Sequence, residues 1–302
     1  MSTALLIVNP TSGRGAWSRL SAGVKDWLRE AGLDFDLVMT EAPGHATQIA
    51  RQAAERAQRK IIAVGGDGTV NEVLNGMLQA DLDPEKTVLG VLPIGTGNDF
   101  AVGADLSLKL EDACHVVMGC RTQTLDIGLF RPGEAEPRYF GNGIGVGFDA
   151  MANIESRKIK RLRGTLLYLV AVLRTLAFYY DAPQASIQLD DGEIAQPCLM
   201  ISVMNGRTMG GGFQMTPDSR MDDGLLDLCI AAAVSRPKMI SFVPRFLRGT
   251  HITDHDITMT QSRRVAIRSV TPWAAQVDGE IYGAGARQFE IELLPQRLRL
   301  LH

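Results

Sequence analysis

Short apolar runs rich in β-branched residues alternate with longer amphipathic stretches through the first half of the chain. The apolar runs span 4–8, 35–39, 61–64 and 88–92, and the amphipathic stretches span 17–31, 47–59 and 70–78. In the stretch 17–31, one helical stripe collects Leu20, Val24, Trp27, Leu28 and Ala31. Gly32 follows where such a helix would end. The alternation predicts βαβ units and therefore a parallel sheet.

The pattern changes after about residue 130. A turn-rich break at 131–137 is followed by strand-like runs at 185–189, 225–230, 264–270 and 289–294. Asp-Asp-Gly and glycine-rich turns separate these runs, which is typical of a β-rich segment. A chain of 302 residues is long enough for two domains. We therefore expect an α/β domain followed by a β-rich one.

Charge and cysteine content narrow the class of protein. The 31 Lys and Arg residues nearly balance 34 Asp and Glu residues, and the net charge of −3 argues against a nucleic-acid binder. The four cysteines are scattered without the spacings of a metal site, which indicates reduced thiols. The N-terminal residues lack the pattern of a signal peptide, and the most apolar stretch, 166–180, is short for a bilayer span. We expect a cytoplasmic protein.

The strongest chemical signal is a glycine-rich loop placed between a predicted strand and a predicted helix. It reads Gly65-Gly66-Asp67-Gly68-Thr69-Val70-Asn71-Glu72. Glycines let a backbone turn sharply beside a ligand, and the N-terminus of the following helix offers N–H groups to a phosphate. An ordinary tight turn would explain one or two glycines but not an acid among three. The loop therefore predicts a nucleotide site.

Two further loops follow predicted strands of the same sheet. One is the run from Leu92 to Phe100, and the other is the run from Val8 to Gly15. Ligands of open α/β sheets gather beyond the carboxyl ends of the strands, so the three loops should line one crevice. There is no GxxxxGK[ST] loop in the chain, which excludes a P-loop kinase.

Together the motifs resemble the diacylglycerol kinase catalytic-domain family, which includes bacterial lipid kinases and is related to sphingosine kinases. They are Asn9-Pro10-Thr11-Ser12-Gly13, Thr40 with Gly44-His45-Ala46, Gly65–Glu72, Pro93–Phe100, Asp126-Ile127-Gly128, Asn142 with Gly145–Ala150, Asp223–Asp227 and Asp278-Gly279-Glu280. They stand in the family's order over nearly the whole chain. NAD kinases share the Gly-Gly-Asp-Gly-Thr element, but the other motifs favour the lipid-kinase branch.

The resemblance implies an architecture and a boundary. The N-terminal domain would have a Rossmann-like parallel sheet over 1–130, and a sandwich-like domain would cover 131–284. Residues from about 285 to 302 would return to the first domain, and the active site would lie in the cleft between the two domains. The residues implied to surround ATP are Asn9, Pro10, Thr11, Ser12, Gly13, Thr40, Gly65, Gly66, Asp67, Gly68, Thr69, Val70, Asn71, Glu72, Thr96 and Asn98.

The catalytic groups are expected among the acids of these motifs. By resemblance, the segment Asp278-Gly279-Glu280 supplies the carboxylate that accepts the proton of a lipid hydroxyl. If this segment is extended, Asp278 and Glu280 project to the same face, so the choice between them stays open. Asp67 is the third catalytic residue, and Asp67, Asp99 and Asp126 are expected to hold Mg²⁺.

A second metal site is implied by the resemblance of the segment 216–225 to a structural Mg²⁺ site. Its ligands would be the Arg220 carbonyl, the Asp223 carboxylate and the Leu225 carbonyl. From the residues alone, an Asp-Asp-Gly turn is the plainer interpretation.

The resulting hypothesis is an ATP- and Mg²⁺-dependent lipid kinase, with diacylglycerol as the default acceptor. An NAD kinase and a non-catalytic nucleotide or lipid sensor are the alternatives. The basic run 157–163 before the apolar stretch favours a transient peripheral contact with the inner face of the membrane, although a solvated helix face explains the run equally well. The stretch itself is expected to be a buried or interfacial helix. The sequence leaves the oligomeric state open, a homodimer included.

Overall fold

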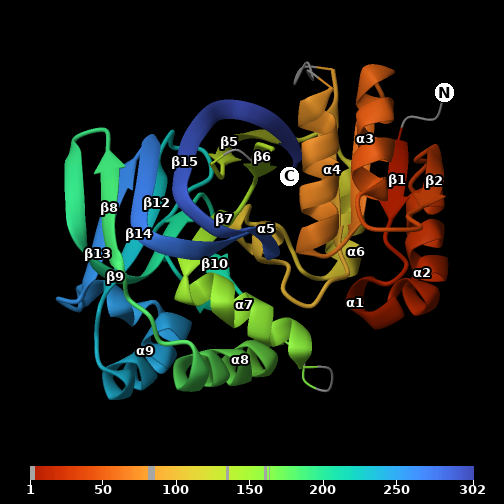
Figure 1. The fold of residues 1–302 in the computed structure, drawn as a ribbon. Coiled ribbons are helices and arrows are strands. Elements are labelled where there is room, and N and C mark those ends of the chain that lie inside the picture. Colours follow the sequence, from red (N-terminus) through yellow and green to blue (C-terminus); the bar gives the residue numbers. More distant parts are fainter. Residues whose placement is uncertain (1–3, 81–85, 134–135, 160–161, 163) are drawn as a thin grey trace.

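Parallel strands form the centre of the N-terminal half, with helices packed around them (Figure 1). The computed structural model describes residues 4–80, 86–133, 136–159, 162 and 164–302. The elements of this half are β1 Ala4–Val8, α1 Ser12–Gly15, α2 Trp17–Glu30, β2 Phe35–Met39, α3 His45–Glu55, β3 Lys60–Gly65, α4 Asp67–Gln79, β4 Val88–Pro93, α5 Asp99–Gly103, α6 Leu110–Met118 and β5 Thr122–Arg131. β1 pairs in parallel with β2 and β3, and β3 pairs in parallel with β4.

The helix predicted over 17–31 forms as α2. Only part of the predicted apolar stripe is buried. Trp17, Val24 and Leu28 are buried against the sheet, whereas Leu20 stays exposed. Gly32 follows with φ +75°, a conformation that suits glycine directly after a helix. The central strand β3 is buried along its whole length, which explains why it reads as a continuous apolar run.

The C-terminal half is built mainly of antiparallel strands, with three helices on one side (Figure 1). Its elements are β6 Arg138–Phe140, β7 Gly143–Gly147, α7 Phe148–Lys158, α8 Gly164–Phe178, β8 Gln184–Leu189, β9 Gly192–Met204, β10 Thr208–Met209, β11 Phe213–Gln214, β12 Leu226–Ala232, α9 Arg236–Arg248, the 3₁₀ turn η1 Thr250–Thr253, β13 Ile257–Ser262, β14 Arg264–Val277 and β15 Glu280–Leu301. The predicted strand-like runs all form strands here.

The last strand, β15, belongs to both halves of the molecule. Its first part pairs with β14, and its later part pairs with β5. At its end Leu300 pairs in parallel with Leu89 of β4. The chain terminus therefore lies on the N-terminal sheet, and this one strand ties the two halves together (Figure 1).

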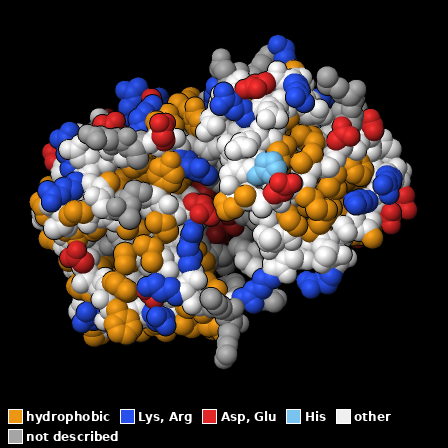
Figure 2. Space-filling model, turned by 45° about the vertical axis from the view of Figure 1, so that its right-hand side comes forward, with side chains coloured by type: hydrophobic (Ala, Val, Ile, Leu, Met, Phe, Trp, Pro, Cys, Tyr) orange, Lys and Arg blue, Asp and Glu red, His pale blue; other side chains and the backbone are white. Residues whose placement is uncertain are grey.

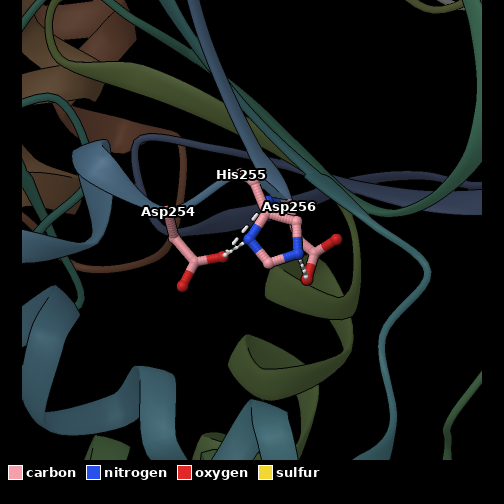
Figure 3. Close-up of side chains that lie close together, drawn as sticks. All are labelled: Asp254, His255 and Asp256. Atoms are coloured by element: carbon pink, nitrogen blue, oxygen red, sulfur yellow. Dashed lines mark hydrogen bonds and ion pairs between the residues drawn. The ribbon is translucent and has the colours of Figure 1, made fainter.

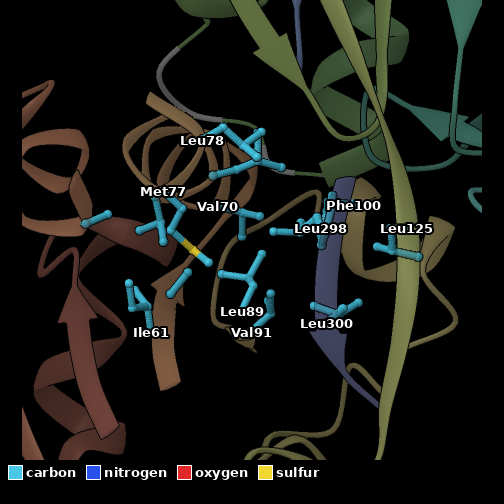
Figure 4. Packing of buried hydrophobic residues seen from close by; sticks show 14 of the residues in the cluster. Ile61, Val70, Met77, Leu78, Leu89, Val91, Phe100, Leu125, Leu298 and Leu300 are labelled. Carbon is cyan, nitrogen blue, oxygen red and sulfur yellow. The ribbon is translucent and has the colours of Figure 1, made fainter. Parts of the chain in front are cut away.

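Each half of the molecule has its own clusters of buried apolar side chains. In the N-terminal half, α4 packs on the sheet through Val70 and Met77 against Leu89, Phe100 and Leu298 (Figure 4). In the C-terminal half, one cluster fills the space between β7, β9, β12 and β14, and another lies under α8 and α9. Within the described residues, the structure has no helix long and apolar enough to cross a membrane.

Candidate active site

The glycine-rich loop and the loop after β4 approach each other backbone to backbone. A Cβ atom on Gly95 would lie 2.4 Å from the Cα of Gly66, and one on Gly65 would lie 2.3 Å from the Thr69 side chain. No residue with a side chain fits at these positions without a shift of the backbone. The sequence of glycines therefore brings the two loops together at the carboxyl end of the sheet, where a ligand of an α/β fold is expected.

The loop after β1 closes on the same point. Gly13 has φ +57°, and a Cβ atom there would lie 2.2 Å from the carbonyl oxygen of Ile94. The side chain of Asn9 donates to the hydroxyl of Thr69 over 3.1 Å, and its oxygen accepts from the hydroxyl of Thr11 over 2.8 Å. The prediction of one shared crevice holds for the loops after β1 and β3, whereas the loop after β4 lines a neighbouring pocket together with the glycine-rich loop.

The loops after β1 and β3 line an open cavity of about 1010 Å³, counting the part open to solvent. Eight of the residues predicted to surround a nucleotide line it: Asn9, Thr11, Ser12, Thr40, Gly66, Gly68, Thr69 and Glu72. Sequence reasoning missed the contributions of Glu41, Ala42, Pro43, Ala46 and Arg157 to this cavity. Arg157 had a signal, because it begins the basic run 157–163.

Other predicted nucleotide residues do not line this cavity. Pro10, Gly13 and Gly65 shape the loops, and Asn98 closes its own loop through two hydrogen bonds with the backbone of Gly95. Asn71 is buried, and its side chain contacts Tyr139, Arg138 and Asp278 instead. Glu72 lines the cavity while its carboxylate accepts from the amides of Gly44 and Ala46, at the start of α3.

We call this cavity the nucleotide cavity, after the predicted residues that line it, and a second, acidic pocket lies next to it. Asp67, Asp99, Asp149 and Asp278 line it together with the predicted residues Val70 and Thr96. None of the described residues that line it is a lysine or an arginine. Figure 2 shows acidic side chains at the hollow between the two halves. Neighbouring residues separate the two spaces, since Gly66 and Gly68 face the cavity while Asp67 faces the pocket.

Backbone amides fix the two carboxylates at the centre of this pocket. Asp67 accepts from the amide of Phe100 over 3.0 Å, and Asp99 accepts from the amide of Gly211 over 2.9 Å. A Cβ atom on Gly97 would lie 2.9 Å from Asp67 and 3.4 Å from Asp99, so glycine leaves the space beside both carboxylates open. Two acids and an open space beside them are suited to a divalent cation.

Burial raises the pKa of the acids in the pocket. For Asp67, burial and the nearby Asp99 carboxylate raise the pKa to about 7. Burial raises the pKa of Asp99 as well, against the effect of the Gly211 amide. Burial raises the pKa of Asp149 to about 6, against the effect of its hydrogen bond from Gln276. Desolvated acids of this kind cluster at functional sites.

The expectation that Asp278 and Glu280 share one face is wrong. Asp278 and Gly279 form a two-residue turn between β14 and β15, with φ +46° and +84°, and Val277 pairs with Glu280 across it. Asp-Gly is a favoured sequence for such a hairpin turn because both positions need positive φ. The segment is therefore not extended, and the two carboxylates point into different surroundings.

The carboxylates of Asp278 and Glu280 have different surroundings. Asp278 is buried and accepts four hydrogen bonds, from the amides of Gly141, Asn142 and Gly143 and from the side chain of Asn71. Burial raises its pKa, and these bonds oppose that rise. Glu280 faces the nucleotide cavity and pairs with Arg157 over 2.8 Å.

Asp126 does not join Asp67 and Asp99 in the acidic pocket. Its carboxylate accepts from the amides of Gly224 and Gln296, each over 2.7 Å. It therefore fixes the turn that carries the second predicted metal site. In that turn, Asp223 is exposed and accepts from the amide of Leu225 over 3.1 Å, while the side chain of Arg220 pairs with Asp222.

An apolar chamber adjoins the acidic pocket inside the C-terminal half. Its space is about 660 Å³, counting the part open to solvent. α8 contributes Tyr168 and Val172, and α9 contributes Phe242 and Phe246 among other residues. Four residues line both the chamber and the acidic pocket: Asp149, Tyr168, Met209 and Gly210. Sequence reasoning did not single out Asp149, although the quoted Gly145–Ala150 motif contains it.

A cluster of two aspartates and a histidine follows η1, the turn after α9. Asp254, His255 and Asp256 place one ligand-type atom each within 4.8 Å of one another (Figure 3). Lys238 pairs with both aspartates, and Arg245 pairs with Asp254 over 2.5 Å. The neighbouring amide of Asp256 and then these cations lower the pKa of Asp254. The cluster already has its counter-ions, so it is an ion-pair network that holds α9 to the following turn.

Family models divide the chain as the fold does. Residues 3–130 match the diacylglycerol kinase catalytic domain, and residues 142–302 match the YegS C-terminal NAD kinase beta sandwich-like domain. A diacylglycerol kinase of Bacillus subtilis is 34% identical over 289 residues, covering 94% of this chain and 91% of that protein. A diacylglycerol kinase of Staphylococcus epidermidis is 30% identical and covers 93% of this chain and 86% of its own.

Solved structures show the same fold. The crystal structure of a diacylglycerol kinase from Bacillus anthracis has a TM-score of 0.76 at 21% identity, covering 99% of this chain and 96% of that chain. Yeast NADH kinase complexed with NADH aligns with a TM-score of 0.51 at 10% identity, covering 98% of this chain and 82% of its own. The family models and the curated relatives identify a lipid kinase. The chain belongs to the diacylglycerol kinase catalytic-domain family of lipid kinases.

Proposed function

We propose that this protein transfers the γ-phosphate of ATP, with Mg²⁺, to the hydroxyl of a lipid alcohol, with diacylglycerol as the default acceptor. The observation that carries the proposal is the order of three spaces: a polar loop-lined cavity, an acidic pocket and an apolar chamber. A phosphate donor, a metal and an acyl chain each have a matching environment in that order. The curated relatives named diacylglycerol kinase support the acceptor class.

The cavity supplies what a nucleoside triphosphate needs. Hydroxyls of Ser12 and Thr69 and the open backbone at Gly68 offer donors to phosphate oxygens beside the N-terminus of α4. Arg157 adds a cation from the opposite half of the molecule. Because the chain has no P-loop lysine, this arginine is placed to offset charge on the phosphates.

Asp67 and Asp99 fit a bound Mg²⁺. Their carboxylates flank the space that Gly97 leaves open, and the pocket has no basic side chain among its described lining residues. Mg²⁺ bound there would offset the negative charge that develops during phosphoryl transfer. Asp67 and Asp99 would hold it directly or through water, as one or two carboxylates usually do. Asp126 serves the neighbouring turn instead.

The chamber accommodates an acyl chain, and its size falls in the usual range for ligand pockets of about 300–1,000 Å³. Its mouth is polar, because Asp149 and Tyr168 stand where the chamber meets the acidic pocket. A lipid with its chain in the chamber would therefore present its hydroxyl to Asp67 and Asp99. Asp149 is placed to orient that hydroxyl end.

Glu280 is the carboxylate that we assign as proton acceptor. Asp278 already accepts four hydrogen bonds, so its oxygens are occupied. Glu280 borders the glycine-rich loop, 3.4 Å from the point where a Cβ atom on Gly68 would lie. It accepts the hydroxyl proton as the oxygen bonds to the γ-phosphate and ADP leaves, and its pair with Arg157 orients it until then.

We further propose a structural Mg²⁺ at the turn 220–225. The Arg220 carbonyl, the Asp223 carboxylate and the Leu225 carbonyl offer oxygen ligands, which Mg²⁺ prefers. Asp126 and the carbonyl of Met221, which accepts from the amide of Asp126 over 2.7 Å, hold the turn against β5. Metal bound there would stabilise the contact between the two halves.

The test of the main proposal is the transfer of labelled γ-phosphate from Mg-ATP in dispersed total lipids with NAD in the aqueous phase. Label in the organic phase supports the lipid kinase, and chromatography identifies the acceptor. Label on NAD would replace the proposal with an NAD kinase. Absence of transfer, with ATP still bound, would favour a sensor.

A further inference from the structure

The apolar surface of this protein is concentrated on one side of the C-terminal half. Among the described residues, ten large hydrophobic side chains are exposed, and five of them lie on α8, directly after it, or on α9. These five are Leu166, Leu173, Phe178, Tyr179 and Ile240. Single exposed apolar residues need no explanation, but a concentration of them marks an interaction surface.

α8 is apolar on every side yet packs on only one. Ala171, Thr175 and Leu176 are buried against the protein. Leu166 and Leu173 are 55% and 41% exposed, and their spacing of seven residues places them on the opposite face, while Phe178, 72% exposed, is the last residue of the helix. A helix that is hydrophobic all round ordinarily has apolar partners all round. Its outer face therefore lacks a partner among the residues that the structure describes.

The charge of this side is complementary to an anionic surface. α8 and α9 together contain no acidic residue and five basic ones, although the whole chain has a net charge of −3. Arg174, Lys238 and Arg245 pair with acids nearby. Arg236 and Arg248 are exposed, and no carboxylate pairs with them in the described part of the chain.

The same two helices form the wall of the apolar chamber. Tyr168 and Val172 of α8 and Met239, Phe242 and Phe246 of α9 face inward and line it. α8 and α9 lie side by side at the bottom of Figure 1, and hydrophobic and basic side chains cover the corresponding lower part of Figure 2. Only this wall separates the exposed apolar residues from the chamber.

We propose that the outer face of α8 and α9 docks on a phospholipid bilayer that contains anionic lipid. We call this the docking face, made of Leu166, Leu173, Phe178, Tyr179, Ile240, Arg236 and Arg248. The apolar side chains enter the boundary between headgroups and acyl chains, and the two arginines pair with lipid phosphates. Of the basic run predicted for membrane contact, Lys160, Arg161 and Arg163 lie outside the described residues, so the docking face rests on other groups.

Docking of this face brings the chamber next to its ligand. An acyl chain could pass from the bilayer between α8 and α9 without crossing water, which removes the cost of exposing its apolar surface. This step rests on the proposed function, because it requires a lipid acceptor in the chamber. The docking itself does not, since it depends only on the outer surface.

The experiment is sedimentation of the full chain with vesicles of phosphatidylcholine, with and without phosphatidylglycerol. Wild type should bind the anionic vesicles and bind the neutral ones more weakly, and salt should weaken the binding. The pair Leu173→Ser and Phe178→Ser should weaken binding at least about tenfold. The pair Arg236→Gln and Arg248→Gln should weaken binding to anionic vesicles about 30-fold and to neutral vesicles little.

The matched control is the pair Leu20→Ser and Leu108→Ser, which removes exposed apolar side chains of the N-terminal half. It should bind like wild type. Binding of Mg-ATP and the unfolding temperature check that each variant folds. Equal binding by wild type and both docking-face variants would overturn the proposal, as would equal loss in the control pair.

Phosphate transfer separates this proposal from the proposed function. With a short-chain acceptor dispersed in detergent, the docking-face variants should match wild type, and with acceptor in anionic vesicles they should be slower. Vesicle binding without transfer to any lipid would refute the proposed function and leave the docking face standing. Full transfer by the variants from vesicles would refute the docking face and leave the kinase standing.

Discussion

Asn71 on α4 donates its side-chain amide to the carboxylate of Asp278 over 2.9 Å, although the two residues are 207 positions apart. The same carboxylate accepts three backbone amides at the start of β7, so it links the N-terminal helix to the C-terminal sheet. The position of the acidic pocket relative to the nucleotide cavity depends on this link, because Asp67 begins α4 and Glu280 directly follows the Asp278 turn.

Asp278→Asn should therefore destabilise the protein more than it alters the chemistry. An amide in place of one carboxylate oxygen would point N–H groups at backbone N–H groups, and the expected loss is about 3 kcal/mol in the free energy of unfolding. Urea denaturation measures it. A variant as stable as wild type would show that these four hydrogen bonds do not carry the link.

Glu280→Gln should retain Mg-ATP binding and lose at least about 100-fold in turnover, because glutamine cannot accept the hydroxyl proton. Steady-state transfer and ATP titration measure the two effects. Glu292→Gln is the matched control, since Glu292 also pairs with an arginine, Arg131, but lies outside the site. Unchanged turnover in Glu280→Gln would remove the assignment of this carboxylate as proton acceptor.

The glycine loops could be recognised from the sequence because their effect is local. Each follows a predicted strand, and glycine is required where backbones meet, as at Gly66 and Gly95. The different positions of Asp278 and Glu280 could also have been predicted from the sequence, since Asp-Gly between two strand-like runs is typical of a hairpin turn. The extended interpretation overlooked that signal.

The acidic pocket could be assembled from the sequence only in part, since Asp67 and Asp99 were expected together and Asp149 was not. Asp149 on α7 accepts from Gln276 on β14 over 3.0 Å, across 127 positions, and Gly145 leaves the room that this carboxylate occupies. Nothing in the local pattern of either residue indicates the other. Asp126 is likewise an acid of the kind that binds metal. Only the register of β5 and β15 shows that its carboxylate accepts from the backbone amides of Gly224 and Gln296.

Stability without metal should fall as pH rises toward neutrality. The folded pKa of Asp67 is about 7 and that of Asp149 is about 6, both above the unfolded values. The folded state then binds more protons between the unfolded and folded pKa values, so stability is lost as pH rises from about 4 to about 7. Unfolding temperatures in the presence of a chelator measure this, and Asp67→Asn should flatten the dependence.

Mg²⁺ should oppose this fall, since it binds the ionised carboxylates. Its stabilising effect should therefore grow from pH about 5 to about 8 in wild type, and grow less in Asp67→Asn. A chelated protein that is equally stable across this range would contradict the raised pKa values. An equal response of both proteins to Mg²⁺ would contradict a site at Asp67.

Asp223→Ala tests the proposed structural metal. The variant should lose the part of the Mg²⁺-dependent rise in unfolding temperature that persists in Asp67→Asn, because it removes the carboxylate ligand. Asp222→Ala is the matched control, since Asp222 lies next to it and its carboxylate makes an exposed pair with Arg220. Identical Mg²⁺ responses in the two variants would argue for a plain turn at 220–225.

The chamber predicts a selectivity that can be changed. Val172 lines it from α8 and is only partly buried, so Val172→Trp should narrow the chamber without overpacking a closed core. We expect the KM for long-chain acceptors to rise about tenfold, while the KM for short-chain acceptors and for ATP stays within about twofold, because each lost methylene contact weakens binding by about 1 kcal/mol. Competition between acceptors of two chain lengths measures the shift. An equal effect on both lengths would place the acyl chain outside this chamber.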